Sequence, residues 1–535
     1  MVFHIARKEF LNNLLSARFV IGFVLCLVLI PFSILINVDE YRERMSLHQI
    51  DADAAEKTVK EVRVYSALRP TVVLPPEPLS IFSKGISAQV GNKVRVRLGE
   101  KPLLAEGRAA TRDNPFLSSF FSVDFVDIAA IIFSLLAFLF SYDAFTREKE
   151  DGTLRLQMAN SLGRSQLLAG KILGVLATLL PVLLFCFLLG AVIILASGNL
   201  AFTAREWGRL ALLAGVSLLY LAVFVFIGFL VSARTKTSVT GLVLCLFLWV
   251  FFVFIIPHLS SYLAESFVPV QSRENLDRVL DDLDQATLRK ISEGEKALPP
   301  PDWFMSWYMN GGEDGRRELY GCTASYYEWE RRRAMMAEPL RIDNADQKWG
   351  AQSAYLDSLS RQSRAADRLA LLSPAGLFRI IASAVCGTDR RAHVSALAGI
   401  RRYRETFLQY LQGKDIFDKF SYFTPTPQSS FKNADQLVEA RTGGEFKTLR
   451  EYDDWAEKQT DWGVRWQILR KVKIPNDHPE DFLFLDISDM PRFAKHAPSL
   501  TEGLRASLFQ VGLMAVLGVF LFYLGYIAFI RFDVR

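Results

Sequence analysis

The sequence predicts an α-helical protein that crosses a membrane six times and carries a large α+β domain between its fifth and sixth membrane helices. Hydrophobic residues make up 51% of the 535 residues, and the mean hydropathy is positive. Charged residues still make up 22%, which is too much for a chain that lies wholly inside a membrane. The apolar residues are concentrated in long uncharged runs. Membrane helices and soluble regions therefore alternate along the chain.

Six apolar segments are long enough to cross a bilayer, which takes roughly 20 residues. The first is followed by Asn37-Val38-Asp39-Glu40 rather than by a small-x-small cleavage site, so we interpret it as an uncleaved anchor and not as a signal peptide. The six predicted spans are Phe19–Asn37, Asp124–Tyr142, Lys171–Ser197, Leu210–Val231, Val239–Pro257 and Ala506–Ile530.

Basic residues gather on one side of these spans, which predicts that this side is cytosolic. Arg205 and Arg209 oppose the trend, but most basic residues near the spans agree with two cytosolic termini. The net charge of +5 is modest, and basic residues beside apolar runs suit lipid headgroups better than nucleic acid. The basic residues on the predicted cytosolic side are Arg7, Lys8, Arg18, Arg147, Lys149, Arg155, Arg164, Lys171, Arg234, Lys236, Arg531 and Arg535.

Two long regions lie on the opposite side, residues 38–123 and residues 258–505. In the first, the polar stretch Glu40–Lys60 predicts a helix, and the alternation from Val94 to Leu98 predicts a strand. The second region begins with charged, amphipathic segments that predict long helices, and such helices beside a membrane often form a stalk. These segments are Ser272–Lys296, Arg317–Ala337 and Asp343–Leu372.

The rest of the second region, Gly413 to Pro498, mixes short strand candidates with turns and is rich in aromatic residues. Before it, the apolar patch Ser373–Ile381 has a proline near a predicted helix start. Two interpretations of this patch stay open. It could be a helix lying in the outer headgroup layer, or a core helix of the outer domain.

The connection between the second and third spans, residues 143–170, is charged and amphipathic. Glu148, Glu150 and Asp151 precede Gly152 and Thr153, which predicts a turn and a helix N-cap with acids at the positive end of the helix dipole. The alternative is an ordinary interhelical loop. Apolar side chains then recur at helical spacing and predict a short helix with one apolar face, at Leu154, Met158 and Leu162.

The interiors of the spans carry no Asp, Glu, Lys, Arg or His, whereas an ion-driven carrier normally needs such a residue. Secondary transport and a polar channel are therefore disfavoured, and the energy for any transport must come from elsewhere. Asp124 and Asp127 lie on one helical face at the outer end of the second span. They are candidates for an outer gate that meets a cargo headgroup, and the alternative is that they mark the water interface.

The sequence offers little catalytic or metal-binding chemistry. The string Gly163–Lys171 is similar to a phosphate-binding loop, but it has six residues before Gly170-Lys171 instead of four, and Ile172 replaces the magnesium-binding Ser or Thr. Six scattered His residues predict no dedicated metal site. Of five cysteines, Cys322 and Cys386 fall outside the spans, where a disulfide between them stays open.

The run from Arg147 to Leu154 resembles the coupling-helix signature of ABC-2 type exporter permeases. That signature begins with acid-x-acid-x-Gly-Thr-Leu. It continues with a turn made of a small residue and Arg, and then with a Gly-Lys pair that opens the next span. Gly163-Arg164 and Gly170-Lys171 stand at the latter two places. Residues 1–18, with Arg7, Lys8 and Glu9, are similar to the family's amphipathic elbow helix. This resemblance covers essentially the whole chain and implies a six-helix, type V exporter-like arrangement.

The large domain between spans five and six resembles that of a bacterial subgroup with a domain of unknown function (DUF3526), and the nitrous-oxide-reductase maturation permease is a more distant relative. The motifs that carry this likeness are Leu372-Ser373-Pro374, Asp389, Met490-Pro491-Arg492-Phe493 and Arg531-Phe532-Asp533-Val534-Arg535.

The resemblance implies a permease subunit of the bacterial inner membrane that is not itself an enzyme. ATP and Mg²⁺ would be bound by a separate ATPase subunit, and a second permease copy or a paralogue would complete the complex. Arg164 and Lys171 would reach lipid phosphate or the ATPase, and Arg7 and Lys8 would hold the elbow helix. The implied docking residues are Glu148, Glu150, Gly152, Thr153, Leu154, Arg164, Gly170 and Lys171.

We therefore expect ATP-driven export of an amphipathic, lipid-like or peptide cargo. The alternative is a mechanotransmitting permease that relays ATP-driven motion to a periplasmic protein or lipoprotein without moving a substrate. A third interpretation, a membrane-anchored adhesin or sensor, leaves the charged segment at residues 143–170 unexplained.

Overall fold

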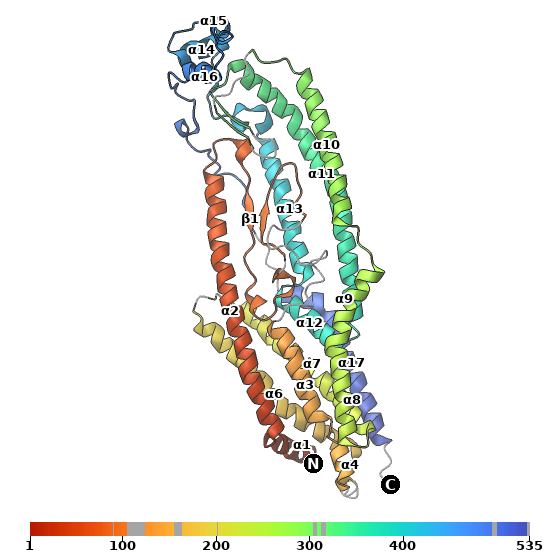
Figure 1. Cartoon of the computed structure of the whole chain (residues 1–535). Coiled ribbons are helices and arrows are strands. Elements are labelled where there is room, and N and C mark those ends of the chain that lie inside the picture. The colour runs from red at the N-terminus through yellow and green to blue at the C-terminus, as the bar shows by residue number, and fades with distance from the viewer. Residues whose placement is uncertain are drawn as a thin grey trace.

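The structure is a computed structural model that describes residues 1–88, 90–103, 124–154, 163–198, 200, 202–302, 308–311, 317–494 and 500–531. The molecule is elongated (Figure 1). The apolar helices gather at one end together with the short helix α4 (Thr146–Glu150), and helix α1 (Val2–Leu14) lies there too. A second set of helices extends away from this bundle. We call this second part, within residues 61–103 and 268–494, the distal region.

Six helices of the described chain are long and apolar enough to cross a membrane, which agrees with the predicted number. Each overlaps one of the six predicted spans. They are α2 (Ala17–Lys60), α3 (Phe125–Ser141) together with α4, α6 (Arg164–Ala196), α7 (Ala204–Arg234), α8 (Ser238–Val250) continuing through the π-helical turn η5 (Phe251–Ile255) into α9 (Ile256–Phe267), and α17 (Leu500–Ile530).

Helix α7 lies at the centre of the bundle. Its Thr203 N-cap and Glu206 form a capping box, which satisfies the free backbone N–H groups at its start. It packs against α3 and α17, and the Tyr220 hydroxyl donates a 2.8 Å hydrogen bond to the Ala130 carbonyl of α3. By contrast, α8 keeps large apolar side chains such as Val239 and Phe247 exposed, as expected for a face that meets lipid tails.

The distal region is mainly helical in its described residues. Helix α2 runs without a break from the first span to Lys60, which confirms the helix predicted at Glu40–Lys60 and joins it to the membrane helix. Beside it, strands β1 (Thr71–Val73) and β2 (Lys93–Arg95) form an antiparallel pair with Val72 opposite Val94. This pair confirms the strand predicted around Val94.

Three long helices and a cluster of short ones build the rest of the distal region (Figure 1). Strands β3 and β4 form a second antiparallel pair. The elements are α10 (Arg273–Ala297), β3 (Tyr308–Gly311), β4 (Arg317–Tyr320), α11 (Ala324–Ala370), α13 (Arg390–Gly413), α14 (Ala434–Thr442), α15 (Leu449–Ala456) and α16 (Trp462–Leu469), with short 3₁₀ turns at Tyr65–Ala67, Pro78–Ile81, Gly85–Ala88, Ile416–Asp418, Phe420–Tyr422, Gln428–Ser430 and Pro479–Asp481.

Two predictions for this region were wrong. The segments predicted as separate helices at 317–337 and 343–372 form the single helix α11, which passes through Pro339, and Arg317–Tyr320 is a strand. Fully buried Ala337 and Ala345 hold α11 on both sides of the proline, and such packing lets a helix continue past it. The short strands predicted between 413 and 498 are short α-helices and 3₁₀ turns in the described residues.

Helix α12 (Pro374–Cys386) joins the two parts of the molecule. Its apolar side chains are buried against α3, α7 and α17, and the Phe378 ring stacks on Tyr220 with 4.5 Å between ring centroids. Its Ser373 N-cap accepts hydrogen bonds from two backbone N–H groups and donates one to the Phe252 carbonyl in the π-helical turn η5. The patch at 373–381 is thus a core helix, but its core is that of the membrane bundle.

Replacing Ser373 with Ala removes the N-cap of α12 and its bond to Phe252. We expect this variant to lose about 1 kcal/mol of stability, because a missing cap leaves backbone N–H groups unsatisfied. Ser373→Thr keeps the hydroxyl and serves as the control. The measurement is the temperature at which detergent-solubilised protein loses its monodisperse elution peak, and an equal temperature for Ser373→Ala and wild type would contradict the capping role.

Candidate functional site

The charged connection between the second and third membrane helices lies at the end of the bundle where several helices meet. Helix α4 follows α3 after a short bend, and α1, α6, α7 and α8 all have an end or a side chain beside it (Figure 1). Three of its charged residues, Glu148, Lys149 and Glu150, each bind a different neighbour. The short helix is therefore attached to several membrane helices at once.

Lys171 of α6 is at the centre of these contacts. Its Nζ atom lies 2.8 Å from Glu148 Oε1 of α4 and 3.1 Å from Glu9 Oε1 of α1, and it also donates to the Ala144 carbonyl at 2.8 Å. Only 3% of the Lys171 side chain is exposed. A buried ammonium group needs such partners because its charge has left water. One lysine therefore holds α1, α4 and α6 together.

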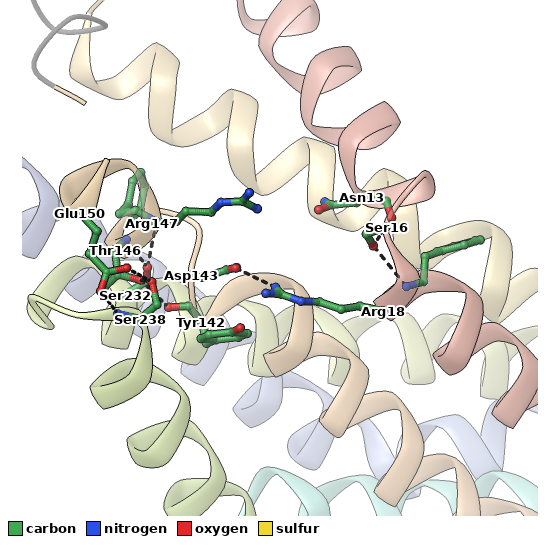
Figure 2. A network of polar contacts seen from close by, with 12 residues as sticks. Asn13, Ser16, Arg18, Tyr142, Asp143, Thr146, Arg147, Glu150, Ser232 and Ser238 are labelled. Atoms are coloured by element: carbon green, nitrogen blue, oxygen red, sulfur yellow. Dashed lines mark hydrogen bonds and ion pairs between the residues drawn. The ribbon is translucent and has the colours of Figure 1, made fainter. Parts of the chain in front are cut away.

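Lys149 and Glu150 bind the adjoining ends of α7 and α8. Lys149 Nζ donates to the backbone carbonyls of Ser232, Ala233 and Thr235 at the C-terminal end of α7, at 2.8–3.1 Å. This is the favourable end of a helix dipole for a cation. Glu150 accepts from the backbone N–H and the hydroxyl of Ser238 at the start of α8, where the helix dipole favours an anion (Figure 2).

A second ion pair connects the first membrane helix to the same segment. Arg18 Nη1 at the start of α2 lies 2.7 Å from Asp143 Oδ2, and its guanidinium sits over the Tyr142 ring. Figure 2 shows Arg18 reaching from α2 across to the bend between α3 and α4. The Ser232 hydroxyl of α7 accepts hydrogen bonds from the backbone N–H groups of Phe145 and Thr146 in this bend. The bend is therefore fixed on two sides.

Helix α1 packs tightly along the start of α6. A Cβ atom on Gly170 would lie 2.7 Å from Ile5, and one on Gly174 would lie 2.5 Å from the Glu9 Cβ. Two glycines four residues apart leave a flat helix surface on which another helix can come close. This contact brings Glu9 within reach of Lys171. Gly170, which we expected to contact the ATPase, thus contacts α1.

Gly152 ends α4 in a left-handed conformation, with φ +71° and open space around its Cα. This confirms the predicted turn, but Thr153 is not an N-cap: it is already helical, and its hydroxyl donates to the Glu148 carbonyl at 3.5 Å. The acids lie in the helix before the turn instead of the one after it. Leu154 is buried, and the predicted face continues at Met158 and Leu162, outside the described residues.

These contacts correct several expected roles. Glu148 and Lys171 bind each other inside the bundle, so neither is available to lipid phosphate or to another subunit. Arg164 also points inward and donates to the Ile530 carbonyl at the end of α17. The exposed side of this segment consists of Arg147, Glu150, Asp151 and Gly152, of which Glu150 is bound to Ser238. On α1, Arg7 and Lys8 are exposed, and their role in holding the elbow helix stays a prediction.

Asp124 and Asp127 do not face water. Asp124 is the N-cap of α3 and accepts hydrogen bonds from the Asp127 and Lys84 backbone N–H groups, at 3.0 and 2.8 Å. Asp127 pairs with Arg379 of α12, with 2.7 Å between Oδ1 and Nε. Their carboxylates are buried and occupied, so they cannot receive a cargo headgroup directly. Asp127 instead positions an arginine that the sequence alone did not single out.

The disulfide between Cys322 and Cys386 is not formed, and all five cysteines are free and buried. Cys386 ends α12 in the membrane-bundle core, whereas Cys322 belongs to a separate core in the distal region. Burial raises the pKa of the Cys322 thiol, so it stays protonated at neutral pH. Both residues pack as small apolar groups.

Replacing Lys171 with Met leaves the carboxylates of Glu9 and Glu148 together without their cation. Breaking one partner of a buried ion pair costs about 3–5 kcal/mol, so we expect this variant to be strongly destabilised. The variant Lys171→Met/Glu148→Gln/Glu9→Gln removes all three charges and should recover much of the loss. The measurement is thermal stability in detergent, and a Lys171→Met protein as stable as wild type would contradict the assigned contacts.

Comparisons with known proteins agree with this architecture. Residues 3–423 match the family model described as ABC-2 family transporter protein. A stretch of 126 residues is 36% identical to the probable ABC transporter permease protein NosY of Pseudomonas aeruginosa. This match covers 24% of the chain and 46% of NosY, so the chain spans about half the length of that relative. Because the family model covers most of the chain, the protein belongs to the ABC-2 family of transporter proteins.

Proposed function

We propose that this chain is the permease subunit of an ATP-driven exporter, and that a separate ATPase subunit docks on the exposed side of α4 and Gly152. ATP and Mg²⁺ are bound by that partner. A second permease copy or a paralogue completes the complex, in the bacterial inner membrane. The cargo is amphipathic, lipid-like or a peptide.

The observation that carries the proposal is the attachment of α4 to its neighbours. Through Glu148, Lys149 and Glu150 it binds α6, α7 and α8, and through Lys171 it is joined to α1. A force applied to α4 from outside the membrane therefore acts on four helices at once. Its exposed residues Arg147 and Asp151 are the ones that a docked subunit would contact.

Charge supports the orientation. The end of the molecule that carries α4 also carries exposed Arg7 and Lys8 and the start of α2 with Arg18. The positive-inside rule favours the cytosol for such an end. In this orientation the α4 surface faces a cytosolic ATPase, and the distal region lies in the periplasm.

The mechanotransmitting alternative has one observation in its favour. Helix α2 has 44 residues and is about 66 Å long at 1.5 Å per residue. It passes from the Arg18–Asp143 contact beside α4 to the distal region, where Val59 and Val62 pack in a core with β1 and β2 residues. A continuous helix of this kind can carry motion to a periplasmic protein or lipoprotein without a substrate crossing the membrane.

Exchanging the charges of the exposed pair, in the variant Arg147→Glu/Asp151→Lys, tests the docking surface. The exchange preserves net charge because one residue of each sign is replaced by the other. It costs little stability because both side chains are mostly exposed and lie 4.0 Å apart. We expect at least tenfold weaker retention of the ATPase subunit in affinity purification from the native host. The control is Arg273→Glu/Asp277→Lys on α10, an exposed pair with the same spacing. Equal retention by both variants would exclude docking at Arg147 and Asp151.

Cysteine labelling tests the orientation. The native cysteines are buried, so an introduced exposed cysteine should dominate the reaction with a membrane-impermeant maleimide. We expect Arg278→Cys on α10 to react in intact spheroplasts, because its side chain is 69% exposed. Arg147→Cys, 73% exposed, should react only after lysis. The opposite pattern would reverse the proposed topology.

A further inference from the structure

A cavity of about 690 Å³ lies where the distal region meets the membrane helices. Its walls come from the last turns of α11, from α12, from the first turns of α13 and from α17. On α17 the lining includes Ser507, Phe509 and Gln510, which follow Arg505, the last charged residue before the apolar run of this helix. The cavity is therefore level with the end of the sixth membrane helix that lies away from α4.

Arginine dominates the charge of this cavity. The two aspartates in its wall are engaged: Asp367 lies 3.3 Å from Arg390 Nη2, and Asp389 caps α13 through a 3.1 Å bond from the Ala392 N–H. Burial raises the pKa of both carboxyl groups. The net charge of the lining is positive because five arginines contribute to it, Arg364, Arg368, Arg379, Arg390 and Arg391.

Arg379 is the most buried of the five, with 10% of its side chain exposed. Asp127 lies against its Nε atom, while Nη1 is buried and makes no hydrogen bond within the described part of the chain. A buried donor without an acceptor is costly. The guanidinium thus has one edge fixed by a carboxylate, while its Nη1 atom stays without an acceptor in a residue that lines the cavity. This is the arrangement expected where an anionic oxygen is to be bound.

Arg364 and Arg368 lie one turn apart on α11, and both are exposed. Like charges four residues apart disfavour a helix. Neither arginine makes an ion pair with any residue that the structure describes. Within the described residues, their charges therefore stabilise the fold through no ion pair, but they raise the positive electrostatic potential at the cavity.

An apolar stripe leads from the cavity along the membrane helix. Phe509 lines the cavity and is 70% exposed. Val516 and Phe520 follow on the same side of α17 at helical spacing, and both are also exposed. A free anion would make no use of this stripe, whereas the apolar chain of an amphiphile would lie on it.

We propose that this cavity receives the anionic headgroup of an amphiphile whose apolar chain lies along α17. A phosphate or carboxylate group is the matching chemistry, because guanidinium groups bind both through paired hydrogen bonds. The inference rests on the proposed function, since it names the class of cargo that the exporter takes. The headgroup site lies at the outer surface of the membrane, where Arg379, held by Asp127, is the most buried arginine of the lining.

The test uses the purified full-length protein and phosphatidylglycerol as the probe, with retention measured by native mass spectrometry. Wild type should retain phosphatidylglycerol at least tenfold more strongly than phosphatidylcholine. Arg364→Gln/Arg368→Gln should lose most of this preference, and Arg364→Lys/Arg368→Lys should keep part of it. The matched control is Arg289→Gln/Arg361→Gln, which removes two exposed arginines outside the cavity. All variants must elute as monodisperse protein.

Equal retention by the Gln double variant and the control would overturn the proposal. Displacement of phosphatidylglycerol by millimolar inorganic phosphate would also overturn it, because the site would then bind a free anion and not an amphiphile. Lipid retention is measured without nucleotide or ATPase. A failure here therefore leaves the retention of the ATPase by the Arg147 and Asp151 surface untouched, and the two proposals fail separately.

Discussion

The contacts at one end of this molecule depend on a buried lysine. Lys171 holds the carboxylates of Glu148 and Glu9 within 3.1 Å, and it can do so because Gly170 and Gly174 let α1 lie close against α6. Without the lysine, two carboxylates would share a nearly dry space, which favours separation of α1 from α4. The Gly-Lys pair that resembles a family signature is therefore a structural joint: the glycine admits a helix, and the lysine binds it.

The charged segment around α4 is part of the same set of contacts with the membrane helices. A docking loop that merely offered acids to a partner would leave Glu148 and Glu150 unpaired. Here both bind neighbouring membrane helices, and Lys149 binds the end of a third. The motif thus attaches α4 to the bundle, and Arg147 and Asp151, on either side of the anchored residues, remain for a partner. A partner that moves α4 must move α6, α7 and α8 with it, because each is held by a charged contact.

The sequence predicted the coarse fold well because uncharged runs of membrane length have few alternatives. It also located Gly152 as a turn, since a glycine after a charged run often ends a helix. It could not predict side-chain pairing. The resemblance implied that Glu148 docks the ATPase, whereas Glu148 binds a lysine that lies 23 residues further along the chain. The local sequence around Pro339 does not show that α11 continues. The helix stays intact because Ala337 and Ala345, on the two sides of the proline, are buried against other parts of the chain.

The two ends of the protein are connected by α17. At one end Arg164 binds the carbonyl of Ile530, and at the other Ser507 and Phe509 line the arginine-rich cavity, about 35 Å away at 1.5 Å per residue. Helix α12 packs against both α7 and α17 and carries Arg379 into the same cavity wall. Helices α3 and α17 thus each pack against both α7 and α12. A shift of α7 against α17, imposed through α4, must change the spacing of the surfaces on which α12 rests. The arginines of the cavity wall come from three different helices, so their separation, and with it their hold on an anion, depends on that spacing.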